Sequence, residues 1–267
     1  MSWSQALRRD LATHARSWAK TNGIDHYESL GDEPTVLFAP TIDRRSHGNF
    51  QDDAWQAITQ NADWNRRLAK PHSQKRALPE KEGAAANELD SSNSSDALLM
   101  NCFCFPGFSD TFARSAGQVP STPTFGFLAE LELLDGTRDA TEIDMKLGGV
   151  LVEAKLTESD FTRRPEPHVL RYSGLERCFD LDSLPRESGE ITGYQLIRNV
   201  LAAEQHGARL LVLIDQRRPD LLQEWWRVHG SIRNTDLRLR CGFRTWQEIA
   251  AASPRVLREF LHAKYGL

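Results

Sequence analysis

Three ionisable residues in the middle of the chain have the types and spacing of a metal-dependent hydrolytic site. Asp144 and Glu153 are separated by eight residues, and Lys155 lies two positions after Glu153. Opposed carboxylates repel each other, and Mg²⁺ relieves this repulsion because it binds one or two carboxylates together with waters and phosphate oxygens. Lys155 would stand beside the metal-bound water and orient it, or help to deprotonate it, for attack on a phosphodiester.

A β-hairpin is the element that must bring these residues together. Two runs that alternate apolar and polar residues, 141–147 and 150–156, are separated only by Gly148 and Gly149. Two glycines between alternating runs predict a two-residue turn, because such a turn needs positive φ angles. The predicted register places Asp144 directly opposite Glu153.

The same register places Glu142 opposite Lys155. Because side chains alternate along a strand, Glu142, Asp144, Glu153 and Lys155 share one face, and the residues between them form a wholly apolar face. The alternative is a solvent-facing hairpin with cross-strand ion pairs, above all between Glu142 and Lys155, which would contribute little to stability.

The segments after the hairpin predict a helix–strand–helix unit. A helix is expected over 192–206, ended by Gly207, and the apolar run 210–214 predicts a strand buried on both faces. A further helix is expected to start at Pro219. With an expected strand over 125–133, this order predicts an α/β fold with a mixed central sheet flanked by helices.

The first part of the chain predicts a different organisation. Residues 2–70 are expected to be helical, and the Ser- and Ala-rich stretch 71–95 reads as a linker by composition. A short apolar helix is expected over 96–104. The segment Ser46-His47-Gly48-Asn49 is interpreted as a plain loop, because it lacks the second ligand set of a histidine-based nuclease site.

With these residues and elements in place, the chain resembles the PD-(D/E)XK, or restriction-endonuclease-like, nuclease superfamily. Asp144 followed by Glu153-Ala154-Lys155 is similar to its core signature. The resemblance implies that Asp144 and Glu153 bind Mg²⁺, with Mn²⁺ as an alternative, that the Ala154 carbonyl is an extra ligand, and that Lys155 is the catalytic lysine. It also implies a helical N-terminal region over 1–90 and a nuclease core with C-terminal helices over 91–267.

Other positions are compared with the superfamily pattern one by one. Gln195 matches a Gln that members often carry beside the site, although Asn199 stands where a Tyr would follow. The expected first core helix, 96–104, has no Glu, so Glu132 or Glu142 is the candidate for an extra acid. The resemblance also makes Ser91 to Ser95 an ordered lead-in to that helix, against the linker interpretation.

Net charge, the share of arginine and the cysteine count bear on the partner and on the location of the protein. The net charge of −4 argues against a general polyanion-binding surface, but only 7 of the 33 basic residues are lysines, and arginine suits phosphate contacts better. We expect two arginine pairs that flank core elements, Arg163 with Arg164 and Arg217 with Arg218, to contact phosphates of the nucleic acid. The 4 cysteines read as reduced structural thiols, and we expect a cytoplasmic protein that is neither exported nor inserted in a membrane.

The sequence therefore predicts a metal-dependent DNA endonuclease of restriction-like type. Two alternatives remain open at this stage: a non-catalytic nucleic-acid-binding or scaffold protein on the same fold, and an RNase with the same catalytic residues. DNA is the expected partner and RNA the alternative, and a homodimer is an alternative to a monomer.

Overall fold

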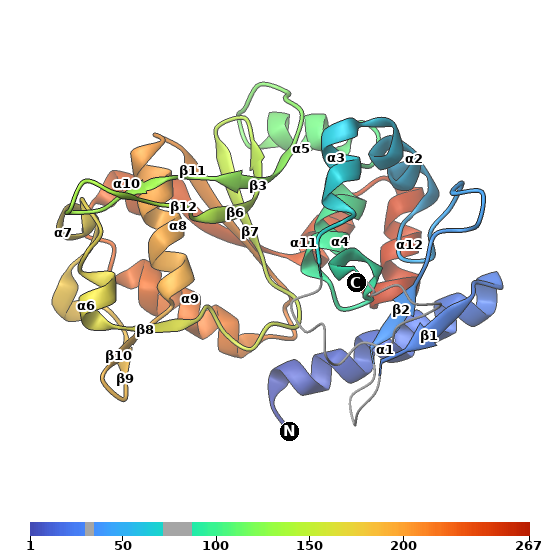
Figure 1. Cartoon of the computed structure of the whole chain (residues 1–267), viewed down its shortest axis with the longest axis horizontal. Helices are drawn as coiled ribbons and strands as arrows, with labels where there is room; N and C mark the ends of the chain where they lie inside the picture. Colours follow the sequence, from blue (N-terminus) through green and yellow to red (C-terminus); the bar gives the residue numbers. More distant parts are fainter. Residues whose placement is uncertain (30–34, 72–86) are drawn as a thin grey trace. The chain divides into compact units, whose positions relative to one another are not determined.

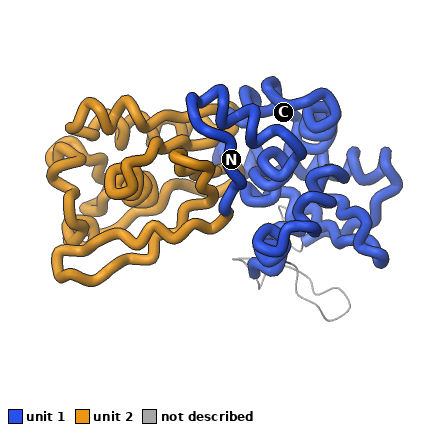
Figure 2. Tube along the Cα trace, turned by 90° about the horizontal axis from the view of Figure 1, so that it is seen from above, with its two compact units in different colours: residues 1–124, 245–267 blue, residues 125–244 orange. Residues whose placement is uncertain are grey.

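The computed structural model describes residues 1–29, 35–71 and 87–267. The chain divides into two compact units (Figure 2): unit 1 comprises residues 1–124 and 245–267, and unit 2 comprises residues 125–244. The domain boundary expected at residue 90 stays a prediction, although the contacts group residues 91–124 with the N-terminal part of the chain. Most of the expected linker, residues 72–86, lies outside the described residues.

Unit 1 is mainly helical. Its described helices are α1 (Trp3–Asn22), α2 (Asp52–Gln60), α3 (Ala62–Arg67), the 3₁₀ helix η2 (Glu88–Asp90), α4 (Ser95–Phe103), α5 (Phe108–Ser115), α11 (Trp246–Ala252) and α12 (Arg255–Tyr265). The expectation that residues 2–70 are helical is wrong between α1 and α2, where no described residue is helical and strands β1 (His26–Glu28) and β2 (Val36–Phe38) pair in antiparallel fashion. Ser91, Ser92 and Ser94 are buried before α4, as expected of an ordered lead-in.

Unit 2 is built around a mixed five-stranded sheet (Figure 1). The strands lie in the order β12–β11–β7–β6–β3. Their bounds are β3 (Thr124–Leu128), β6 (Glu142–Leu147), β7 (Val150–Ala154), β11 (Arg209–Ile214) and β12 (Cys241–Thr245). Strand β11 runs parallel to β7, whereas β6 is antiparallel to it. The predicted α/β fold with a mixed sheet is confirmed.

Smaller elements surround this sheet. The short strands form two further sheets: β4 (Leu131–Glu132) pairs with β5 (Arg138–Asp139), and β8 (Arg163–Pro165) pairs with β10 (Glu190–Thr192), which also pairs with β9 (Arg186–Glu187). The helices are α6 (Glu166–Val169), α7 (Leu175–Cys178), η3 (Leu181–Ser183), α8 (Tyr194–Gln205), α9 (Pro219–Gly230) and α10 (Thr235–Arg240).

The β6–β7 hairpin has the predicted register. Leu147 pairs with Val150 and Met145 pairs with Val152. Only the first glycine of the turn, Gly148, has a positive φ, at 57°. This is the pattern of a type II′ turn, which has a positive φ at its first central residue alone, whereas the sequence had suggested positive values at both glycines.

Helix α8 covers the face of the sheet that carries the polar residues of the hairpin. Its apolar side, including Leu196 and Val200, packs in one buried cluster with Leu151 of β7 and Val212 of β11. Burial of these side chains fixes the rotation of α8 about its axis, because apolar residues three and four apart form a single stripe. The stripe of α8 that lies beside this apolar side therefore faces the end of β7.

Candidate functional site

Glu153 and Lys155 form a buried ion pair at the end of β7. The Lys155 Nζ lies 2.9 Å from Glu153 Oε1, and the Glu153 side chain is fully buried. The two residues meet because they are two positions apart along an extended segment, so their side chains project from the same face. The predicted closeness of Glu153 and Lys155 is thus present in the structure.

The charge environment keeps the lysine protonated. Burial alone lowers the pKa of Lys155, but the nearby carboxylates of Glu153, Glu158 and Asp144 outweigh it, so that the pKa lies above the ordinary lysine value. A protonated ammonium donates hydrogen bonds and balances negative charge. It does not remove a proton, so of the two roles expected for Lys155 this state suits the orientation of a water.

Asp144 reaches the same point from β6. Its Oδ2 accepts a hydrogen bond from the Ala154 backbone N–H at 2.8 Å. If the antiparallel β6–β7 ladder continued to this point, a backbone carbonyl of β6 would accept this N–H. The Asp144 carboxylate accepts it instead. The side chain of Asp144 is thereby held beside the peptide that links Glu153 to Lys155.

Asn199 of α8 contributes a contact that the sequence did not assign. Its Nδ2 donates to Glu153 Oε2 at 2.8 Å, and the residue is fully buried. Gln195, the predicted site residue one turn earlier, is half-buried. Its backbone N–H donates to the Phe161 carbonyl, but no described contact joins its side chain to Glu153. Asn199 could have been predicted as a site residue from its spacing of four residues from Gln195, because both side chains project from one side of α8.

Glu158 is a second residue that the sequence analysis missed. Its Oε2 accepts the Leu156 backbone N–H at 2.7 Å, and its negative charge contributes to the raised pKa of Lys155. The acid therefore closes the turn that follows β7. Its position three residues after Lys155 was the only signal in the sequence.

The donor set at the hairpin suits a hard divalent cation. The Asp144 carboxylate contacts the Ala154 N–H, the Glu153 carboxylate belongs to the preceding residue, and the buried Asn199 Oδ1 has no hydrogen-bond partner among the described residues. Over the described part of the chain no group of three or more His, Cys, Asp or Glu side chains is arranged to hold a metal ion. Two carboxylates are nevertheless sufficient for Mg²⁺, which keeps several waters and binds substrate phosphate oxygens.

The two candidates for an extra acid lie in different places. Glu142 is exposed at the first position of β6, on the same face as Asp144. Glu132 is exposed in β4, where its backbone N–H donates to Gln205 Oε1, and its described contacts do not join it to Asp144 or Glu153.

The two predicted arginine pairs differ in how accessible their guanidinium groups are to a ligand. Arg163 and Arg164 are both exposed on β8, and Arg163 pairs with Glu187 at 3.3 Å. Arg217 pairs with Asp215 through two hydrogen bonds. Arg218 is fully buried and donates to the carbonyls of residues 156 and 159 and to the carboxylate of residue 220. Its predicted phosphate contact is inconsistent with this burial, since its guanidinium has no access to a ligand.

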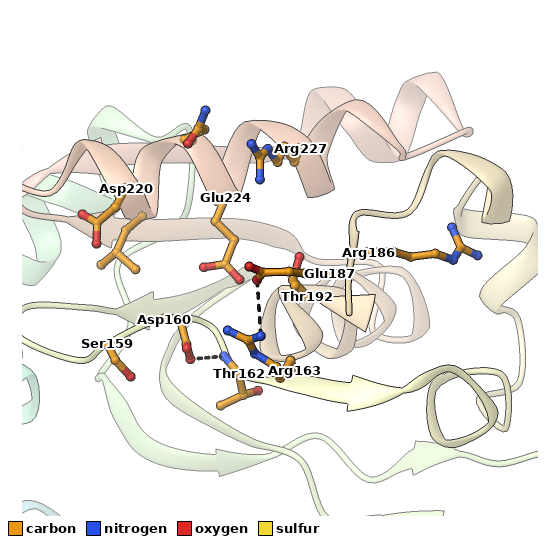
Figure 3. Close-up of a pocket in the computed structure, with 12 residues that line it drawn as sticks. Ser159, Asp160, Thr162, Arg163, Arg186, Glu187, Thr192, Asp220, Glu224 and Arg227 are labelled. Atoms are coloured by element: carbon orange, nitrogen blue, oxygen red, sulfur yellow. Dashed lines mark hydrogen bonds and ion pairs between the residues drawn. The ribbon is translucent and has the colours of Figure 1, made fainter. Parts of the chain in front are cut away.

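A cavity of about 410 Å³ lies elsewhere in unit 2 (Figure 3). Arg163, Glu187 and Glu224 are among the residues that line it, and Glu224 accepts the Phe161 N–H at 3.2 Å. Burial raises the pKa of Glu224. Both acidic and basic side chains line this cavity, and its lining does not include Asp144, Glu153 or Lys155. It is therefore distinct from the hairpin site.

The chain matches a known protein family over nearly its whole length. The family described as "Restriction Endonuclease associating with ARP" matches residues 14–266. The chain belongs to this family. The superfamily resemblance inferred from the hairpin is confirmed by this restriction-endonuclease assignment, and the family name indicates a nuclease that acts on nucleic acid.

No curated protein and no solved structure matches the chain. Among the described residues, no helix combines the length and the apolar character required to cross a membrane.

Proposed function

We propose that the chain is a Mg²⁺-dependent deoxyribonuclease that cleaves phosphodiester bonds at the β6–β7 hairpin. The observation that carries the proposal is that the Asp144 carboxylate accepts from the Ala154 N–H, next to Glu153, and that the Lys155 ammonium lies 2.9 Å from Glu153. This geometry joins hard oxygen ligands to a proton donor, which is the combination that phosphodiester hydrolysis needs.

Each residue of the proposed site has a defined role. Asp144, Glu153 and the Ala154 carbonyl would hold the cation, with Mn²⁺ as an alternative to Mg²⁺. When bound, the cation supplies positive charge to the phosphate oxygens and lowers the pKa of a coordinated water. Lys155 orients the attacking water and balances charge, and Asn199 fixes the Glu153 carboxylate so that it does not rotate away.

The scaffold alternative makes a different prediction about the carboxylates. A protein that only binds nucleic acid does not require two acids and a buried ammonium at one strand end, because burying charged groups is costly unless they are paired. Isothermal titration with Mg²⁺ or Mn²⁺ separates the two alternatives. Carboxylate-dependent metal binding supports the nuclease, and its absence supports the scaffold.

The direct test is cleavage by purified variants. The full-length protein is incubated with supercoiled DNA, linear DNA, single-stranded DNA and RNA in Mg²⁺, Mn²⁺ or EDTA. Asp144→Asn and Glu153→Gln should each lower the cleavage rate at least about 10²-fold, in line with the loss of a preorganised charged group. Glu259→Gln removes an exposed carboxylate of α12 and serves as the matched control.

Two results would contradict the proposal. One is cleavage by Asp144→Asn at the parent rate in excess Mg²⁺. The other is cleavage of RNA but not DNA, which would keep the site and reassign the substrate.

A further inference from the structure

We infer that Arg164, Arg171 and Arg198 form a second phosphate-binding site, which holds an internal backbone phosphate of the nucleic-acid strand beside the one that is cleaved. This inference rests on the proposed nuclease function and names a further part of the substrate site. The three arginines come from β8, from the segment after α6 and from α8, and they converge on two buried tyrosines, Tyr172 and Tyr194.

The tyrosine rings position the guanidinium groups. The guanidinium carbons of Arg198 and Arg164 lie 5.2 Å and 5.5 Å from the centroid of the Tyr194 ring, and that of Arg171 lies 5.6 Å from the Tyr172 ring. Cations at this distance from an aromatic ring are attracted by its negative face. Because both rings are almost fully buried, they hold the cations in place at little entropic cost.

A directed chain of hydrogen bonds fixes the rings themselves. The Tyr172 hydroxyl donates to Asp139 Oδ2 at 2.5 Å, and the Tyr194 hydroxyl lies 2.5 Å from that of Tyr172. Since the Tyr172 hydrogen is used on Asp139, Tyr194 must donate to Tyr172. His168 Nε2, at 3.0 Å from the Tyr194 hydroxyl, then donates to it. This order places the hydrogen of a neutral His168 on Nε2.

The cluster carries more positive charge than its protein partners compensate. Arg198 pairs with Asp139 at 3.2 Å. Arg164 donates to the Arg163 carbonyl at 2.9 Å, and Arg171 forms side-chain hydrogen bonds with Tyr172 and Tyr194. Among the described residues, no ion pair joins either guanidinium to a carboxylate. These contacts are to neutral oxygens, so the charges of the two guanidinium groups are not balanced by an ion pair, and their remaining N–H donors match phosphate oxygens.

The position of the cluster ties it to the proposed catalytic site. Arg198 immediately precedes Asn199, whose amide holds Glu153. Arg198 Nε also donates to the Thr141 hydroxyl at 2.8 Å, at the entrance to the strand that carries Asp144. Phosphates recur every ~3.4 Å along the axis of each DNA strand, so a neighbour of the cleaved phosphate lies within reach of such a cluster.

The test measures DNA binding without cleavage. The full-length protein, Arg164→Gln, Arg171→Gln and the double variant are titrated in EDTA with a short fluorescein-labelled DNA duplex at several KCl concentrations. The double variant should reduce the slope of log K against log salt by about 0.9, because one phosphate contact is lost, and it should weaken binding equally for unrelated sequences. Arg255→Gln, an exposed arginine paired with Glu259 on α12, should leave the slope unchanged.

The outcomes separate this inference from the proposed function. A double variant with the slope and affinity of the parent overturns the inference, whereas failure of the parent itself to bind DNA overturns the DNA substrate and the inference with it. Duplexes with and without 5′-phosphates should give the same loss, and a loss confined to phosphorylated ends would overturn the assignment to an internal phosphate. Arg164 is exposed, so its variant carries the test even if Arg171→Gln lowers the thermal stability.

Discussion

A completely buried carboxylate must have its charge compensated inside the protein, and Glu153 meets this requirement through two neighbours. The ammonium of Lys155 faces one of its oxygens and the amide of Asn199 donates to the other. Removal of one partner exposes the remaining charge to an apolar environment, which costs more than the hydrogen bond itself contributes. The side chains around Glu153 therefore serve stability as well as the proposed chemistry.

Asn199→Ala is expected to lower the free energy of unfolding by about 1.5–3 kcal/mol, because a buried charged acceptor loses its neutral donor. Urea denaturation at neutral pH measures this change. Gln223→Ala, which removes an exposed amide from α9 in the same unit, should change stability little. Equal unfolding midpoints for the parent and Asn199→Ala would show that Glu153 does not depend on this amide.

At the scale of elements, the turn between β6 and β7 determines whether the proposed site exists. A slip of one residue in the pairing would send the side chains of Asp144 and Glu153 to opposite faces of the sheet. The observed pairing of Leu147 with Val150 prevents this, and the positive φ of Gly148 is the conformation that permits the turn.

Gly148→Ala and Gly149→Ala should therefore differ, although the two glycines are adjacent. Alanine at Gly148 must adopt a left-handed conformation, which costs about 1–2 kcal/mol, whereas Gly149 has no positive φ to maintain. Thermal unfolding of the two variants, together with their cleavage rates, measures the difference. Equal losses would indicate that the turn has a different type.

The strength of the local pattern explains which elements were predictable. Strands β6 and β7 and helix α8 have five residues or more of clear periodicity, and β11 is a continuous apolar run. All four were expected near their observed positions. Strands β1 and β2 were not expected, because three residues are too few to establish an alternation. The hairpin acids followed from the register, whereas Asn199 depended on how α8 packs on the sheet, which no local pattern encodes.

At the scale of the whole molecule, residues far apart in sequence complete unit 1. Lys264 of α12 is buried, and its Nζ donates to Asn49 Oδ1 at 2.6 Å. Asn49 in turn donates to the carbonyls of Leu89 and Ser91. Gly48 precedes Asn49 because a Cβ there would lie 2.4 Å from the Phe38 ring. The segment interpreted as a plain loop is thus an internal support for the C-terminal helix.

Because of Lys264, the free energy of unfolding should change with pH below the ordinary pKa of lysine. Burial lowers the pKa of Lys264 well below its ordinary value. Between the folded pKa and about 10.4 the unfolded chain binds the additional proton, so the free energy of unfolding rises with pH across this window and falls as the pH is lowered. Lys264→Met should reduce the slope by up to about 1.4 kcal/mol per pH unit, as measured by urea denaturation.

The comparison is best made above about pH 7.5, where His47, whose pKa is also lowered by burial, is neutral in both states. The absolute stability of Lys264→Met does not enter the test, since only the difference in slope reports the titration. Parallel pH profiles for the parent and the variant would mean that Lys264 is charged in the folded protein.

The division of unit 1 between residues 1–124 and 245–267 also has a consequence for synthesis on the ribosome. All residues of unit 2 leave the exit tunnel before α11 and α12, so the proposed catalytic hairpin is made while unit 1 still lacks its last two helices. A nascent chain arrested between these two stages would carry the hairpin acids but would leave Asn49 without the amine of Lys264.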